Sequence, residues 1–81
     1  MKRQTNIEIL ILENGRTITV EFKYDKGDDM ADDVWGEIVD EMHEAIRNKD
    51  IWFCGNWSDV FAKYGETYMN WINMEKVVGI M

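Results

Sequence analysis

A chain of 81 residues with a formal net charge of −7 is long enough for one domain with a single small core, which we expect to span residues 1–81. Hydrophobic residues make up 46% of the sequence, which excludes a disordered chain despite the charge. The negative balance excludes direct nucleic-acid binding, because phosphate recognition needs clustered lysine and arginine. The apolar run Ile7–Leu12 is interrupted by Glu8 and is too short to cross a bilayer, so we expect no membrane partner.

The first predicted element is a β-hairpin. Asn14-Gly15 lies between two β-rich runs, Ile7–Leu12 and Thr17–Tyr24. Asn-Gly favours a two-residue type I′ turn, because both central positions of that turn require positive φ. The turn would pair Glu13 with Arg16 and set the register of both strands.

This register assigns one face of the hairpin to the core and the other to solvent. The three apolar pairs expected on the core face are Ile11–Ile18, Ile9–Val20 and Ile7–Phe22. Leu10 and Leu12 would lie on the opposite, mostly solvated face.

Residues 28–48 predict an amphipathic helix. Its apolar residues recur at spacings of three and four and are Met30, Ala31, Val34, Trp35, Ile38, Val39, Met42, Ala45 and Ile46. Asp28 or Asp29 is expected to cap the start, and Arg47 and Lys49 suit the negative end of the helix dipole. Gly36 lies off the apolar stripe and costs about 1 kcal/mol relative to alanine.

The aromatic-rich last third is predicted to be mainly β-structure. The candidate strands are Ile51–Cys54, Val60–Tyr64, Thr67–Ile72 and Val77–Met81, with Gly65-Glu66 as a two-residue turn. In an alternative reading, Ser58 caps a short helical turn over residues 59–64. The fold class we expect is α+β, with an antiparallel sheet in ββαβββ order and one amphipathic helix packed on one face.

The sequence lacks the sets of residues that catalytic sites and metal sites require. His43 and Ser58 are the only residues of their kinds, which leaves no zinc ligand set and no catalytic triad. Carboxylates are plentiful, but a glycosidase pair must face each other across a cleft, whereas these follow one helix face. A hard-cation site among the aspartates of residues 28–33 lacks the alternating spacing of a calcium loop. We therefore expect a non-enzyme without metal or cofactor.

The single cysteine, Cys54, indicates a reducing compartment. Cys54 cannot form an internal disulfide, and we expect it to be a small buried hydrophobe. A free thiol of this kind is typical of a reducing environment, so we place the protein in the cytoplasm.

The negative charge is concentrated in the predicted helix and its flanks. Residues 28–50 contain nine acidic and two basic residues, a net of −7, whereas residues 1–27 carry +1 and residues 51–81 carry −1. Four like-charge pairs stand four residues apart: Asp29–Asp33, Asp33–Glu37, Glu37–Glu41 and Asp40–Glu44. Each pair destabilises a helix by a few tenths of a kcal/mol. The face either serves solubility alone or is a docking surface for a basic partner.

The candidate partner-binding residues are these acids and one tryptophan: Asp29, Asp32, Asp33, Glu37, Asp40, Glu41, Glu44 and Trp57. Trp57 is included because seven aromatic residues crowd between positions 52 and 71, more than one small core holds easily. Exposed tryptophan is a favoured anchor of protein interfaces.

Two functional hypotheses follow from these residues. In the first, the chain is a non-catalytic protein-binding module whose acidic helix face occupies a basic, nucleic-acid-binding groove of a partner protein. Small acidic inhibitors of bacteriophages and mobile elements act in this way, and the chain resembles them in size and charge only. In the second, it is a structural or homodimerising accessory protein that associates through Leu10, Leu12 and an exposed strand edge.

Overall fold

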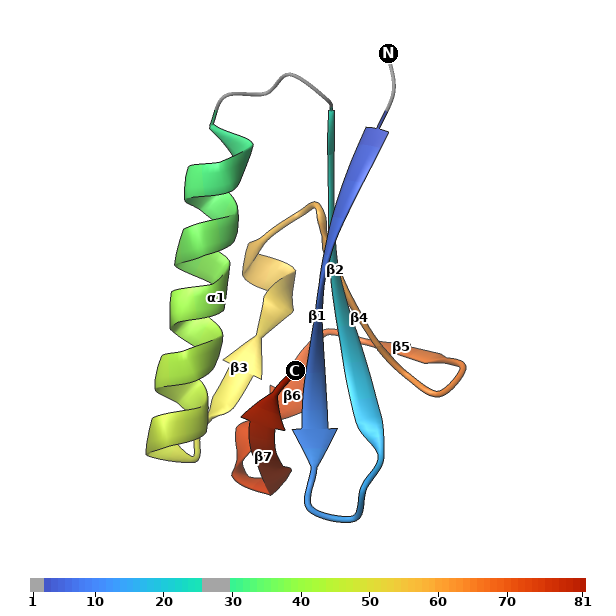
Figure 1. Cartoon of the computed structure of the whole chain (residues 1–81), viewed down its shortest axis with the longest axis vertical. Coiled ribbons are helices and arrows are strands. Elements are labelled where there is room, and N and C mark those ends of the chain that lie inside the picture. Colours follow the sequence, from blue (N-terminus) through green and yellow to red (C-terminus); the bar gives the residue numbers. More distant parts are fainter. Residues whose placement is uncertain (1–2, 26–29) are drawn as a thin grey trace.

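The structure, a computed structural model, describes residues 3–25 and 30–81 and confirms an α+β fold with an antiparallel sheet and one helix (Figure 1). The elements in chain order are β1 (Arg3–Leu12), β2 (Thr17–Asp25), α1 (Ala31–Asn48), β3 (Ile51–Phe53), the 3₁₀ turn η1 (Cys54–Asn56), β4 (Val60–Tyr64), β5 (Thr67–Met69), β6 (Trp71–Asn73), the 3₁₀ turn η2 (Met74–Lys76) and β7 (Val77–Ile80).

The strands form two antiparallel sheets. Five of them make a sheet in the order β5-β4-β2-β1-β7, and β3 pairs with β6 in a separate two-stranded sheet. Figure 1 shows α1 along one side of the molecule and the five-stranded sheet along the other, with β3 between them. The small sheet therefore helps to fill the space between helix and large sheet.

The strand order after the helix differs from the predicted ββαβββ order. The predicted strand Thr67–Ile72 divides at Asn70: β5 continues the large sheet, and β6 turns away to pair with β3. Val60–Tyr64 is the strand β4, so the alternative helical turn over residues 59–64 is wrong. Tyr64 lies opposite Thr67, which leaves Gly65-Glu66 as the two-residue turn that the sequence predicts.

The register of the first hairpin differs from the predicted one by a single residue. Its loop contains three residues, because the Leu12 N–H donates to the Arg16 carbonyl at 2.8 Å. Gly15 occupies the third loop position with a φ of +85°. Glycine in the left-handed region suits this three-residue loop as well as the type I′ turn, so Asn14-Gly15 did not distinguish them.

The shifted register reverses the two faces of β1. Leu10, rather than Ile9 or Ile11, lies on the core side opposite Ile18 and is fully buried. The predicted core placement of Ile7, Ile9 and Ile11 is wrong for this reason, and Leu12 packs against the core instead of lying on a solvated face. The assignments on β2 hold, since its residues Ile18, Val20 and Phe22 are all buried.

Helix α1 packs its apolar side against this core. Its buried residues are Ala31, Ile38, Met42 and Ala45. The ring of Trp35 stacks on that of Phe22 from β2, with centroids 5.9 Å apart and planes 10° from parallel. This contact joins the helix directly to the centre of the five-stranded sheet.

The helix is three residues shorter at its start than predicted. It begins at Ala31 with Met30 at the N-cap position, and the side chain of Met30 makes no capping hydrogen bond. Asp28 and Asp29, the expected caps, lie outside the described residues. At the other end Lys49 adopts a left-handed conformation and its N–H donates to the carbonyls of Ala45 and Ile46. No helix in the described part of the chain is long and apolar enough to cross a membrane.

Candidate functional site

Four carboxylates form a row on the side of α1 that faces away from the core. We call this row the acidic stripe: Asp33, Glu37, Asp40 and Glu44. At 100° and 1.5 Å per residue they occupy an arc of about 60° and a length of about 16 Å. All four residues are exposed. The helical period that buries Ile38 and Met42 therefore also collects these charges on the solvent side.

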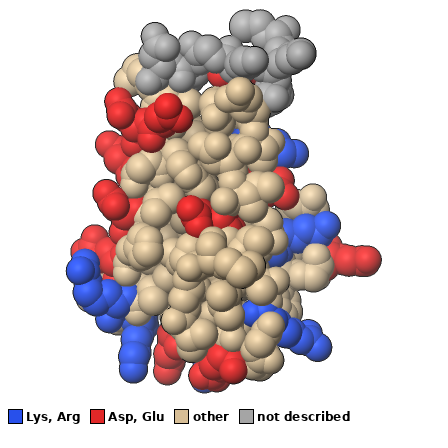
Figure 2. Space-filling model, viewed as in Figure 1, with Lys and Arg blue, Asp and Glu red and all other residues tan. Residues whose placement is uncertain are grey.

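The acidic stripe has no cationic partner within the described part of the protein. The ion pair found among residues 3–25 and 30–81 is Lys76–Glu13, 3.4 Å apart, and neither residue belongs to α1. Arg47 lies one turn after Glu44, yet no ion pair joins Arg47 to the stripe in this part of the chain. Figure 2 shows carboxylates along the side formed by α1, with cations at its lower end and on the sheet side.

Three cations of the sheet, Arg16, Lys23 and Lys63, lie over aromatic rings. Arg16 donates to the Tyr64 hydroxyl at 3.0 Å, and its guanidinium lies 5.9 Å from that ring. Lys23 lies over Phe61 at 5.8 Å. Their positions leave the acidic stripe open to cations from outside.

Of the remaining predicted acids, Asp32 is exposed in the first turn of α1, where the helix dipole favours it. Glu41 has an internal role, because its carboxylate accepts a hydrogen bond from Trp57 Nε1. Asp29 falls outside the described residues. The structure thus brings four of the seven predicted acids into one row and places Asp32 and Glu41 at its flanks.

Trp57 is not the exposed anchor that the sequence suggests. Its side chain is half-buried against the core and tied to Glu41, so it fastens the segment after η1 to the helix. The exposed tryptophan is Trp71, with 62% of its surface accessible, and its ring stacks on Phe53 with centroids 4.2 Å apart. Alternation along a strand predicts that some aromatics face outward, but not which strand supplies them.

A shallow hollow of about 200 Å³ lies beside the C-terminal half of the acidic stripe. Its lining residues are Glu41, Glu44, Ala45, Asn48, Asp50 and Trp52. Asp50 was not among the predicted site residues because it follows the helix in sequence. Its side chain accepts a hydrogen bond from the N–H of Ile51 at 2.8 Å, which holds it at the start of β3. Three carboxylates therefore surround a space open to a cationic side chain.

The described residues offer neither a cluster of metal ligands nor a reactive thiol. No group of three or more histidine, cysteine, aspartate and glutamate side chains among them could hold a metal ion. Cys54 is free and buried, as its sequence context predicts, and its Sγ donates to the carbonyls of Met69 and Asn70. Burial raises the pKa of the Cys54 thiol above its ordinary value, which disfavours the reactive thiolate.

Comparison with known protein families, curated proteins and solved structures finds no match to the chain.

Proposed function

We propose that the chain is a non-catalytic protein-binding module whose acidic stripe engages a basic surface of a partner protein. The observation that carries the proposal is the row of four exposed carboxylates on α1 without a cationic partner among the described residues. A groove that normally holds nucleic acid is a suitable basic surface, so the module would act as a competitive inhibitor there. The free buried thiol of Cys54 suits a reducing compartment, and we place the interaction in the cytoplasm.

Like-charge repulsion within α1 supports a role for the stripe beyond solubility. The described pairs four residues apart are Asp33–Glu37, Glu37–Glu41 and Asp40–Glu44. Each destabilises the helix by roughly 0.2–0.5 kcal/mol, so together they cost about 1 kcal/mol. Solubility alone needs acids anywhere on the surface and does not require this spacing. A basic partner converts the same repulsion into attraction.

The charge density of the stripe indicates what kind of partner it fits. Four carboxylates over about 16 Å are spaced roughly 5–6 Å apart, whereas one strand of duplex DNA has a phosphate about every 3.4 Å. The stripe therefore matches a short row of three or four lysine or arginine side chains. The hollow beside Glu44 and Asp50 offers one of them a partly enclosed position between carboxylates.

The binding test uses a fluorescein-labelled oligoarginine peptide as a defined basic probe, followed by fluorescence anisotropy. The stripe variant is D33N/E37Q/D40N/E44Q, which keeps side-chain size and removes four negative charges. We expect its affinity for the probe to fall by roughly 10–100-fold, as the loss of four exposed charge pairs implies. Wild-type binding should weaken steadily as salt rises.

The matched control removes four exposed acids elsewhere. The variant E13Q/D59N/E66Q/E75Q changes the net charge by the same amount and leaves α1 intact. We expect its affinity to change by no more than about threefold at moderate salt, because these acids are not aligned. Equal losses in the stripe and control variants would show that net charge, not the stripe, governs binding, and would end the proposal.

The inhibitory role has its own test. Purified DNA-binding proteins with basic grooves are mixed with a labelled DNA duplex, and the chain is added as competitor. Wild type should displace the duplex from a protein whose groove fits the stripe, and the stripe variant should not. Displacement by both forms would remove the acidic stripe from the explanation.

A further inference from the structure

The five-stranded sheet has an apolar face that points away from α1. We call it the outer face and define it by five side chains: Ile7, Ile9 and Ile11 of β1, Phe61 of β4 and Tyr68 of β5. The register places them together, because Ile7 and Phe61 flank Glu21 in one row while Ile9 and Tyr68 lie in the next. Exposed fractions of 53% for Ile7, 44% for Phe61 and 69% for Tyr68 show that this face is accessible.

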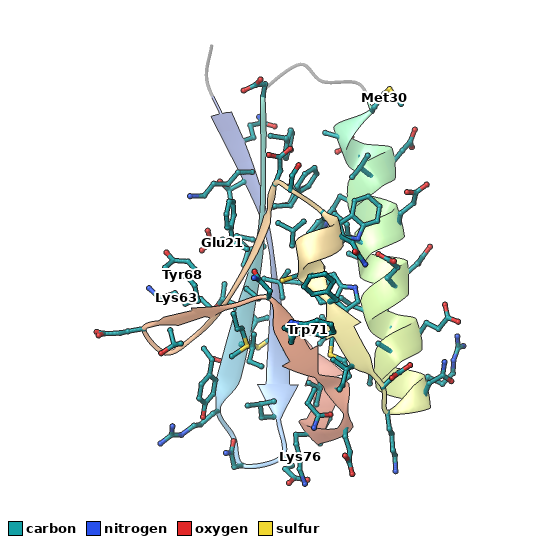
Figure 3. All side chains as sticks on the ribbon, turned by 180° about the vertical axis from the view of Figure 1, so that it is seen from behind. Glu21, Met30, Lys63, Tyr68, Trp71 and Lys76 are labelled. Carbon is teal, nitrogen blue, oxygen red and sulfur yellow. The ribbon has the colours of Figure 1, made fainter. Side chains whose placement is uncertain are left out.

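Helix α1 and the β3–β6 sheet lie on the opposite side of the large sheet (Figure 1). In Figure 3, Glu21, Lys63 and Tyr68 project on the side away from α1. Three isoleucines at alternate positions of one strand, with Ile7 exposed and Ile9 and Ile11 half-buried, are unusual for a sheet face that is only solvated. Such a face is typical of an interaction surface.

The charges on the outer face differ from those of the rest of the molecule. Glu21 lies between Lys23 and Lys63, and each lysine lies over an aromatic ring, at 5.8 Å from Phe61 and 5.3 Å from Tyr68. A shallow depression of about 290 Å³ is lined by four of these residues, Glu21, Lys23, Phe61 and Tyr68. The centre of this face therefore has charges of both signs, in a protein of net charge −7.

We propose that the outer face packs against the same face of a second copy of the chain. Two acidic molecules repel each other least where each presents apolar and mixed-sign surface and where their acidic helices are farthest apart. Packing through the outer face satisfies both conditions, since α1 lies on the far side of the sheet. Glu21 and the two lysines also give the face both partners of a charge pair, as a two-fold symmetric contact requires.

The size of the face sets the strength of the association. Five strands about 4.8 Å apart and about 20 Å of strand length give a face of about 20 by 20 Å. Two such faces bury on the order of 800–1,000 Å² in total, below the roughly 1,200–2,000 Å² of stable complexes. We therefore expect a weak dimer that half dissociates at a concentration between about 10 μM and 1 mM.

Sedimentation equilibrium over this concentration range tests the proposal. The wild-type mass should rise from that of one 9.6 kDa chain toward twice that value. Ile7→Lys and, separately, Phe61→Lys should each weaken dimerisation at least tenfold, because each adds two like charges to the contact. The matched control is Ile51→Lys on β3, where the isoleucine is equally exposed (56%) but lies outside the outer face. It should dimerise as wild type does.

Three outcomes would overturn the proposal. The first is a single-chain mass for wild type throughout the range, and the second is equal weakening by Ile51→Lys. The third is a dimer that resists both outer-face substitutions and is lost in Thr5→Pro. Residues 3–8 of β1 are not covered by β7, and alternation from the Leu12–Arg16 bond directs the Thr5 N–H to this open edge. Loss in Thr5→Pro would therefore indicate pairing through the strand edge.

Dimerisation and stripe binding can be separated experimentally. The stripe variant should dimerise like wild type, and Ile7→Lys should retain its affinity for the oligoarginine probe. Salt should weaken probe binding but preserve or strengthen the dimer, because salt screens the repulsion between two acidic chains. Circular dichroism melting of every variant confirms that it is folded before its mass is interpreted.

Discussion

Leu10 and Ile7 lie on the same strand and differ in their surroundings. Leu10 is fully buried between the sheet and its covering layer, whereas Ile7 is 53% exposed on the outer face. We expect Leu10→Ala to lower the free energy of unfolding by about 3 kcal/mol, and Ile7→Ala to lower it by less than about 1 kcal/mol. Urea unfolding at low micromolar concentration measures both. If Ile7→Ala lowered the free energy of unfolding more than Leu10→Ala does, the result would favour the register predicted from the sequence and contradict the observed one.

The buried thiol of Cys54 makes stability depend on alkaline pH. Its pKa is raised in the folded state by burial, so the unfolded chain loses the proton first as pH rises. The contribution is fully present below the ordinary thiol pKa and is lost as pH rises above it. We expect the stability difference between wild type and Cys54→Ala to shrink between about pH 8 and pH 10. A difference that grows with pH would contradict a raised pKa.

At the scale of elements, replacement by alanine should have opposite effects on stability at two glycines, Gly36 and Gly15. Gly36 lies in α1, is exposed and has nothing within 4 Å of where a Cβ would stand, so Gly36→Ala should stabilise by about 1 kcal/mol. Gly15 adopts a φ of +85°, so Gly15→Ala should destabilise by about 1–2 kcal/mol. Thermal melting of the two variants checks both signs. Stabilisation by Gly15→Ala would contradict the three-residue loop.

The hairpin shows where sequence patterns stop being informative. Asn14-Gly15 correctly located the loop, but glycine with positive φ suits both the two-residue and the three-residue loop. The strand pattern distinguishes them only weakly, because β1 is apolar on both faces, with Ile7, Ile9 and Ile11 on one and Leu10 and Leu12 on the other. A one-residue shift exchanges these faces, and the charge that it moves to the core side is that of Glu8, which pairs with the buried Val20.

The last third shows a second limit of local prediction. Val60–Tyr64 alternates as a strand should, and it is one. The predicted strand Thr67–Ile72 contains no glycine or proline, and the single asparagine at position 70 was too weak a turn signal to predict its division there. The break depends on β6 pairing with β3, a contact about twenty residues away in sequence. Trp71, rather than Trp57, is exposed as a consequence.

At the scale of the whole molecule, charge and apolar surface are segregated. The acidic stripe occupies the outside of α1, and the outer face occupies the far side of the sheet. Helical spacing alone predicted the row of carboxylates, because residues four apart share a helix face. The outer face was not predictable in the same way, because its composition depends on the hairpin register. A dimer through this face would display two acidic stripes on opposite sides, which suits bivalent binding.

The most direct test of the account is the salt dependence of thermal unfolding. If the carboxylates of the stripe repel one another and lack internal cations, salt screens that repulsion and the melting temperature of wild type should rise from low to moderate salt. The variant E37Q/D40N/E44Q, which keeps Asp33 at the favourable N-terminal end of the helix dipole, should melt about 4–8 °C higher at low salt, as a gain of about 1 kcal/mol implies, and respond less to salt. The off-helix control E13Q/D59N/E66Q/E75Q should keep most of the wild-type response. A wild-type melting temperature that falls with added salt, or a variant E37Q/D40N/E44Q that keeps Asp33 in the first turn of α1 and is still less stable than wild type, would show that these carboxylates already have partners within the fold.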